Sequence, residues 1–289
     1  MNNKTNNHII DLSILPTGQI RYKLTNDYMF RAVFQENNNA LKGLLYALLN
    51  LPKERIASAI IENPIELGKS IDDKTCILDL KITLNDQKIL NIEMQVTDYG
   101  DWPERSLTYL CKAFDHLKSG DEYSMIHPTI HIGIIDFNLK NLTPEFYSEF
   151  LMSNTKNHEI YSDKFSLRVL NLKQLDLIRE EQKDDLYYWA KLFKATTWEE
   201  IKMLAEKNDY MGETVVTLHK MTEDEKIAEQ CLARERYERD TLSIYRKGIR
   251  EGRAESEAII AEKDNEIAEK DNEIAKLTRQ LEELKEKMK

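Results

Sequence analysis

The segment from residue 77 to residue 96 constrains the fold most, because apolar and polar residues alternate along both of its halves. This alternation is typical of two half-buried β-strands. On the polar faces of these strands are two acidic residues, Asp79 and Glu93. Two carboxylates on neighbouring strands can hold a hard divalent cation through oxygen ligands. The residues expected to face a core are Leu78, Leu80, Ile82, Leu84, Ile92, Met94 and Val96.

The length of the connection between the two strands decides whether the acids share a face. A two-residue turn would place Asp79 opposite Met94, with the two acids on opposite faces. A three-residue loop over 85–87 would instead place Asp79 opposite Glu93. The sequence has no Asn-Gly or Asp-Gly pair to favour the two-residue turn. We therefore predict an odd-length loop or an equivalent bulge. The alternative is that these charges form an ordinary solvated face.

The flanking segments predict a mixed sheet with helices on its faces. We expect a helix over Leu41–Leu49, a strand over Ala57–Glu62, the hairpin, a helix over Pro103–Lys118 and a buried strand over Pro128–Phe137. The order αβββαβ predicts an α/β (α+β) fold. Further along, Glu159–Leu175 suggests an added hairpin or edge strand, and Asp185–Ala195 a helix packed on it. The aromatics Tyr187, Tyr188, Trp189 and Trp198 are expected in the core, and a base-stacking platform is the alternative.

Four short stretches carry a resemblance to a known family: Leu24–Phe34, Ile77–Lys81, Asn91–Gln95 and Arg105–Tyr109. In this order they resemble the PD-(D/E)XK nuclease superfamily, and within it the Rpn family of recombination-promoting nucleases, often labelled transposases. The resemblance implies a restriction-endonuclease-like core. It also implies divalent-metal-dependent hydrolysis of phosphodiester bonds in DNA, associated with recombination or mobile elements. Two alternatives stay open: an RNA-cleaving nuclease, and a non-catalytic nuclease-fold scaffold that acts through its tail.

The resemblance also assigns roles to individual residues. It implies that Asp79 and Glu93 bind the metal, with the main-chain carbonyl of Met94 as a further ligand. Mg²⁺ is the expected ion, and Mn²⁺ is an alternative. Gln95 occupies the position where most of the superfamily has a lysine. Because a neutral amide offers one acceptor and two donors, Gln95 could position the substrate, and the general base stays unassigned.

Four neighbouring residues are further candidates. Lys81 shares a face with Asp79 and could supply the positive charge that the missing lysine would carry. Arg105 and Tyr109 lie four apart on the predicted helix and share a face, where Arg105 could hold a phosphate; a plain surface pair is the alternative. Asp27 opens a helix behind Thr25 or Asn26, and we favour a helix-dipole role over a third metal ligand.

Other patterns predict little chemistry. The six histidines form no pair at metal-ligand spacing, and His131, in an apolar strand, is expected to be a satisfied core histidine. Cys76, Cys111 and Cys231 form no CxxC pair. No phosphate-binding loop, nucleophile elbow or dinucleotide fingerprint occurs. The formal net charge of −10 is unfavourable for a tight grip on DNA, so we expect transient binding with basic residues gathered at the cleft.

The chain ends in a true heptad repeat, since Glu262–Ala268 recurs unchanged as Glu269–Ala275. We predict coiled-coil heptads over 257–289 and a homodimer through this helix; a single solvated helix is the alternative. Two glycines within Arg246–Arg253 suggest a hinge before it. The a positions are Ile260, Ile267, Ile274, Leu281 and Met288, and the d positions are Lys263, Lys270, Leu277 and Leu284.

The expected organisation has three parts. Residues 1–20 would be a flexible arm, 21–220 a nuclease-like domain with its core at 39–137, and 221–289 a helical tail. No apolar run approaches 18 residues, and the first residues lack the apolar stretch of a signal peptide, so we expect a cytoplasmic protein.

Overall fold

A computed structural model describes residues 11–68, 79–85 and 87–288 of the 289-residue chain. The chain forms two compact units, 1–236 and 237–289. Of the predicted arm and hairpin, residues 1–10, 77–78 and 86 lie outside the described residues. Among those described, no helix is both long and apolar enough to cross a membrane.

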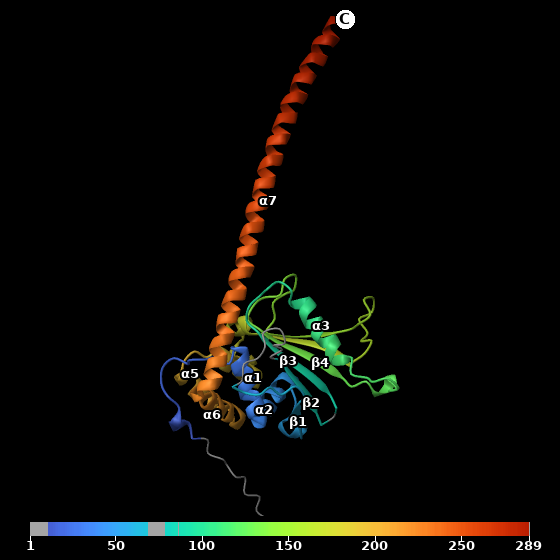
Figure 1. The fold of residues 1–289 in the computed structure, drawn as a ribbon. Coiled ribbons are helices and arrows are strands. Elements are labelled where there is room, and N and C mark those ends of the chain that lie inside the picture. The colour runs from blue at the N-terminus through green and yellow to red at the C-terminus, as the bar shows by residue number, and fades with distance from the viewer. Residues whose placement is uncertain (1–10, 69–78, 86, 289) are drawn as a thin grey trace, which may run out of the picture. The chain divides into compact units, whose positions relative to one another are not determined.

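The first unit is built on a six-stranded mixed sheet (Figure 1). The strand order is β1-β2-β3-β4-β6-β5, with β3, β4 and β6 parallel and the other neighbours antiparallel. The predicted order αβββαβ, the mixed sheet and the long C-terminal helix are confirmed. The strands are β1 (Ala59–Ile61), β2 (Leu80–Leu84), β3 (Ile89–Gln95), β4 (Thr129–Ile135), β5 (Tyr147–Leu151) and β6 (Phe165–Asn171).

Most helices begin where the sequence offers a side-chain cap. Asn26, Asn37, Asp184, Thr197 and Asn208 each accept a hydrogen bond from a backbone N–H in the first helical turn. The helices are α1 (Asp27–Glu36), α2 (Asn38–Leu49), α3 (Trp102–Phe114), α4 (Asp185–Lys194), α5 (Trp198–Ala205), α6 (Asp209–Glu223) and α7 (Glu225–Lys287). Short 3-10 turns are η1 (Leu12–Ile14), η2 (Lys53–Arg55), η3 (Tyr123–Met125), η4 (Leu172–Leu177) and η5 (Glu180–Gln182).

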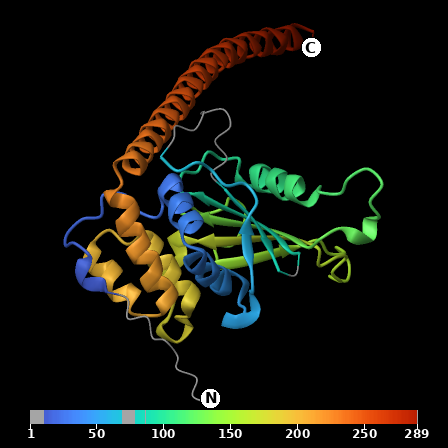
Figure 2. The ribbon, with the colours of Figure 1, turned by 60° about the horizontal axis from the view of Figure 1, so that its bottom comes forward.

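The two faces of the sheet differ in what covers them. The main core lies on the face covered by α1, α2 and the later helices of the first unit, and α3 lies across the other face (Figure 2). Ile82, Ile92 and Ile132 are fully buried on the core face. Of the four aromatics above, Tyr187, Trp189 and Trp198 are buried in this core and Tyr188 is partly buried against it, as predicted.

The hairpin has the predicted register. Leu80 pairs with Ile92 and Thr83 with Ile89, so the same register places Asp79 opposite Glu93. The backbone N–H of Leu84 donates to the carbonyl of Lys88 at 3.0 Å, so the connection between the strands lies between these two residues. An odd-length connection therefore leaves alternating residues of both strands on the α3 face, which is polar at this point.

Three details differ from expectation. The strand within Glu159–Leu175 is β6, which is interior because β5, a strand that was not predicted, covers it at the sheet edge. Helix α3 ends at Phe114, four residues before Lys118. Helix α7 runs unbroken through Gly248 and Gly252, where a hinge was expected, because exposed glycines weaken a helix without ending it.

The first unit includes the start of α7 and ends at Arg236, because Ile227, Ala228 and Cys231 of α7 belong to the main core.

Candidate active site

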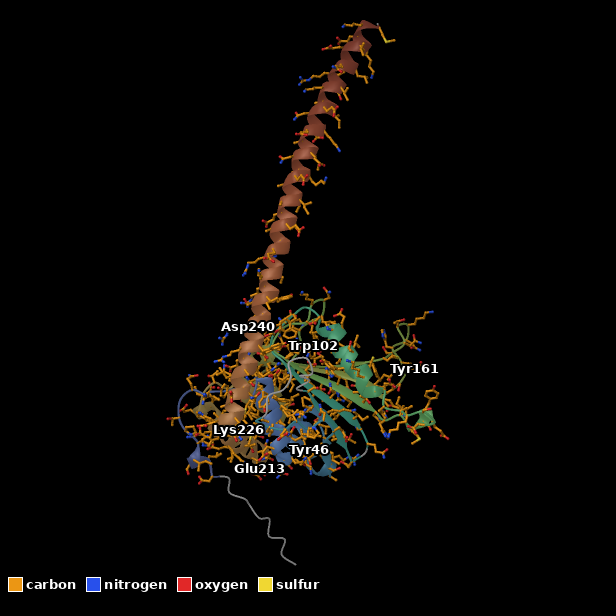
Figure 3. All side chains as sticks on the ribbon, viewed as in Figure 1. Tyr46, Trp102, Tyr161, Glu213, Lys226 and Asp240 are labelled. Atoms are coloured by element: carbon orange, nitrogen blue, oxygen red, sulfur yellow. The ribbon has the colours of Figure 1, made fainter. Side chains whose placement is uncertain are left out.

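The candidate site lies on the α3 face of the sheet, where β2, β3 and β4 present polar side chains. Asp79, Asn91, Glu93 and His131 are all less than a tenth exposed. Asn91 lies opposite His131 in the parallel pairing, and Glu93 lies opposite Gly133. A Cβ at position 133 would come within 2.1 Å of the Trp102 ring. Only glycine therefore allows Trp102, at the start of α3 (Figure 3), to pack this close to the site.

Asp79 is held in place mainly through its backbone. Its carbonyl accepts hydrogen bonds from the guanidinium of Arg31 and, at 3.0 Å, from Nδ2 of Asn63. The side chain of Asn91 hydrogen-bonds to its carboxylate. Oδ1 of Asp79 is nevertheless buried without a hydrogen-bond partner. Burial raises the pKa of Asp79, and the positive charge of Arg31 opposes that shift.

Glu93 is paired on one oxygen only. Its Oε1 accepts hydrogen bonds from Nε and Nη2 of Arg105, at 2.7 and 2.6 Å. Its Oε2 is buried without a hydrogen-bond partner and lies 3.8 Å from Nε2 of His131. Burial raises the pKa of Glu93 to about 7 although Arg105 lowers it, and the nearby Asp79 adds to the rise.

These two carboxylates fit a divalent cation. Buried polar atoms are nearly always hydrogen-bonded, and the two carboxylate oxygens without a protein partner, on Asp79 just before β2 and on Glu93 in β3, are therefore available to coordinate a cation. No group of three or more His, Cys, Asp or Glu side chains suited to a metal occurs in the described part of the chain. Two carboxylates are nonetheless typical of magnesium sites, where water and substrate phosphate complete the coordination.

The remaining predicted residues occupy different places. Lys81 and Tyr109 line a pocket together with Asp79 and Asn91, with a volume of about 380 Å³. Gln95 is buried, and its amide donates to the carbonyl of Thr97 at 3.0 Å. The side chain of Met94 belongs to the main core on the opposite face, and its carbonyl lies between Glu93 and Gln95 along β3.

Arg105 and Tyr109 share a face of α3, as expected. The Arg105 guanidinium lies 5.2 Å from the centre of the Tyr109 ring, and that ring stacks on His131 at 6.1 Å. In the structure Arg105 is bound to Glu93, with two-fifths of its side chain exposed. Arg105 is therefore more than a surface pair with Tyr109.

Asp27 lies apart from this pocket. Asn26 caps α1, and Asp27 follows in the first turn. Both oxygens of Asp27 accept from Nε of Arg234 in α7, at 3.0 and 3.1 Å. Asp27 is not among the residues that line the pocket. This placement supports a helix-terminal role and a tie between α1 and α7.

Sequence reasoning missed the residues that support the acids. Arg31 is fully buried in α1 and donates to the main-chain carbonyls of Asp79 and Asn63. Burial lowers its pKa to about 10, a value at which it stays charged at neutral pH. The one available signal was an arginine inside the otherwise apolar run Tyr28–Phe34 of the predicted helix.

His131 is only half satisfied, which corrects the expectation of an ordinary core histidine. Nδ2 of Asn91 lies 3.0 Å from its Nδ1, and its Nε2 is buried without a partner. Because an amide N–H donates to Nδ1, the neutral ring carries its proton on Nε2, directed at Glu93. Burial, and to a lesser extent Arg105, lowers the pKa of His131 to about 3, so the ring is neutral.

Comparison with known proteins gives one match. The family described as PD-(D/E)XK nuclease family transposase matches residues 24–248, which include all four sequence stretches and every residue of the candidate site. No curated protein and no solved structure matches the chain.

Proposed function

Because the chain belongs to the PD-(D/E)XK nuclease family transposases, we propose that it is an endonuclease that hydrolyses phosphodiester bonds in DNA with a divalent metal ion. The observation that carries this proposal is the pair of buried carboxylates with one unpaired oxygen each, Glu93 in β3 and Asp79 just before β2, in a register that sets them opposite each other. Asp79, Glu93 and the main-chain carbonyl of Met94 would hold the ion. Mg²⁺ is the expected ion and Mn²⁺ the alternative.

A divalent ion at this place would supply a water of lowered pKa and would stabilise negative charge on the phosphate. The chain's own residues prepare the site. Arg31 and Asn63 fix the backbone of Asp79, and Arg105 fixes one oxygen of Glu93, so that the other oxygen of each acid stays available. Such fixed geometry is what positioning and electrostatic catalysis require.

The pocket beside the acids offers a place for the substrate backbone. Lys81 and Lys112 line it together with Tyr109, and the partly exposed Arg105 lies against the Tyr109 ring. These side chains would contact phosphates, and Gln95 would act at most as a positioning group, since its amide is bound to Thr97. These local positive charges would thus favour phosphate binding at the site although the net charge of the whole chain is −10.

The test is a cleavage panel with the purified full chain on plasmid DNA, single-stranded DNA and RNA, with Mg²⁺, Mn²⁺ or EDTA. Asp79→Ala should abolish divalent-dependent cleavage and weaken Mn²⁺ binding measured by electron paramagnetic resonance, with the fold retained by circular dichroism. Asp121→Ala, at an exposed loop carboxylate, is the matched control. Cleavage by Asp79→Ala equal to that of the unchanged chain would sink the assignment.

The same panel separates the alternatives. Preferential cleavage of RNA would replace DNA as the substrate, because the metal chemistry is common to both. The non-catalytic scaffold is favoured by two observations: the acidic net charge of −10 and the glutamine at position 95, where the superfamily usually has lysine. Absence of cleavage on all substrates, together with retained Mn²⁺ binding, would support that reading.

The exposed heptads of α7 support a second element of the proposal. The chain would self-associate through residues 257–289 as a homodimer. Ile267 and Ile274 are 57% and 60% exposed, which is unusual for isoleucines repeated at a fixed spacing. Light scattering on the full chain should give twice the 33.9 kDa mass of one copy.

A further inference from the structure

The last four heptads of α7 form the most extended apolar surface of the second unit. Beyond Asp240 the described side chains project from a single helix (Figure 3). The apolar a and d residues of these heptads, together with Met288 just after the end of α7, are between 53% and 88% exposed: Ile260, Ile267, Ile274, Leu277, Leu281, Leu284 and Met288. An apolar stripe at this spacing needs a partner helix, and its flanking charges select the orientation of that partner.

Charge is segregated along this stripe. Residues 262–275 contain six Asp or Glu and two Lys, whereas residues 276–289 contain five Lys or Arg and three Glu. The first half is therefore acidic and the second half is basic. A second copy running in the opposite direction would bring each acidic half against a basic half. Two copies running in the same direction would bring like halves together.

We propose that α7 pairs with a second copy of this chain as an antiparallel coiled coil with its two-fold axis between Ala275 and Lys276. This inference rests on the proposed self-association but not on the nuclease activity. In this register Ile267 faces Leu284 of the second copy, and Ile274 faces Leu277 of the second copy. Each apolar a position thus meets a d position across the seam.

The lysines at d positions also fit this arrangement. Lys270 would face Leu281 of the second copy, and Lys263 would face Met288 of the second copy, so no two lysines meet. The ammonium of Lys263 lies 2.9 Å from Glu266 of its own helix. Its aliphatic stem can therefore cover the seam while the charge stays at the edge. In a parallel pair, each of these lysines would face its own counterpart.

The flanking e and g positions lead to the same conclusion. In the antiparallel register Glu266 lies beside Lys287 of the second copy, and Asp264 lies beside Lys285 of the second copy. The other flanking pairs, Glu273 with Gln280 and Asp271 with Thr278, carry no like charges. In a parallel pair Glu266 would instead lie beside Asp271 of the second copy, twice per dimer. Like charges at such positions are destabilising.

Disulfide trapping in the full chain tests the orientation. The background carries Cys76→Ser and Cys111→Ser, and it keeps the buried Cys231. One preparation carries Ile267→Cys and another carries Leu284→Cys. Under mild oxidation we expect linked dimers only when the two preparations are mixed. Linkage of either variant with itself would show parallel pairing and overturn the orientation while leaving self-association intact.

A charge exchange provides a second, independent readout. Lys285→Glu with Lys287→Glu should raise the dimer dissociation constant by roughly tenfold or more, since four favourable contacts per dimer become like-charge contacts. Adding Asp264→Lys and Glu266→Lys to the same chain should restore dimerisation. A parallel pair would respond little to the first change, because Lys285 would then lie beside Gln280. A monomer in light scattering would overturn both the self-association and its orientation, without bearing on cleavage.

Discussion

Strand β3 and the last heptads of α7 are opposites: the strand buries polar side chains, whereas the heptads expose apolar ones. All seven residues of β3 are buried, and they include Asn91, Glu93 and Gln95, so polar atoms are placed where water is excluded. In the heptads, apolar side chains such as Ile274 are placed in water. Buried carboxylate oxygens without a partner suit a cation, whereas exposed isoleucines at heptad spacing suit another helix. The kind of group left unsatisfied indicates the kind of ligand expected.

This contrast requires that the first unit hold Asp79 and Glu93 rigidly. Substitution of Arg31 is the strongest test of that rigidity. Arg31→Met would remove the buried guanidinium that donates to the carbonyls of Asp79 and Asn63, and the Asp79 carbonyl would keep only Nδ2 of Asn63 as a donor. We expect a loss of about 3–5 kcal/mol in the free energy of unfolding, measured by urea denaturation. Arg55→Met, at an exposed arginine, is the control and should change stability little. Equal stability of the two variants would mean that Arg31 does not hold the site.

Helix α7 allows the same substitution to be compared in both settings. Ile227 is 4% exposed within the main core, whereas Ile274 is 60% exposed. Ile227→Ala should cost about 2–4 kcal/mol of unfolding free energy, because burial is lost and a cavity remains. Ile274→Ala should cost less than about 0.5 kcal/mol in the folding of one chain, since exposed helical sites tolerate alanine. Its effect should appear instead in the dimer dissociation constant.

Circular dichroism melts at low protein concentration measure the loss of unfolding free energy in each variant. Light scattering measures the change in the dimer dissociation constant. If Ile274→Ala destabilised a monomeric chain as much as Ile227→Ala, Ile274 would be buried in the folded monomer, and the contrast between a buried and an exposed isoleucine of α7 would be wrong.

Two glycines give the smallest and most discriminating effect. Gly133→Ala should destabilise by about 1–3 kcal/mol, because its Cβ would overlap the Trp102 ring. Gly248→Ala should stabilise by about 0.5–1 kcal/mol, because an added Cβ meets nothing within 4 Å and alanine favours the helix. Differential scanning calorimetry should therefore show melting temperatures that move in opposite directions. A rise for both variants would show that Trp102 can move away from the site at little cost.

Patterns of short range made the hairpin and the acid pair predictable. The two-residue period placed Asp79 and Glu93 on one face once the connection was odd, and the structure has that register. The helix α4 and the strand β4 were predictable for the same reason, since each has a strong local pattern. The strand β5 was not, because Tyr147–Leu151 lies at the sheet edge with its first two residues partly buried and its last three exposed, and so lacks alternating burial.

The supports of the site could not be read from local patterns. Arg31 meets the carbonyl of Asp79 across 48 positions of the chain, and Asn91 meets His131 across 40. Such contacts depend on how helices and strands pack, and the same residue types also occur as ordinary surface or core residues. His131 shows the difficulty, because an apolar strand predicted a satisfied histidine and the structure leaves one of its nitrogens without a partner.

The sequence by itself determined the order αβββαβ of the core, the face shared by Asp79 and Glu93, and the heptad spacing of the tail, because each follows from a short period along the chain. Only the tertiary structure decided that each acid keeps one oxygen free, that Arg105 occupies the other oxygen of Glu93, and that Arg31 anchors Asp79. Those features depend on distances between segments far apart in the chain, and a periodic pattern carries no information about them.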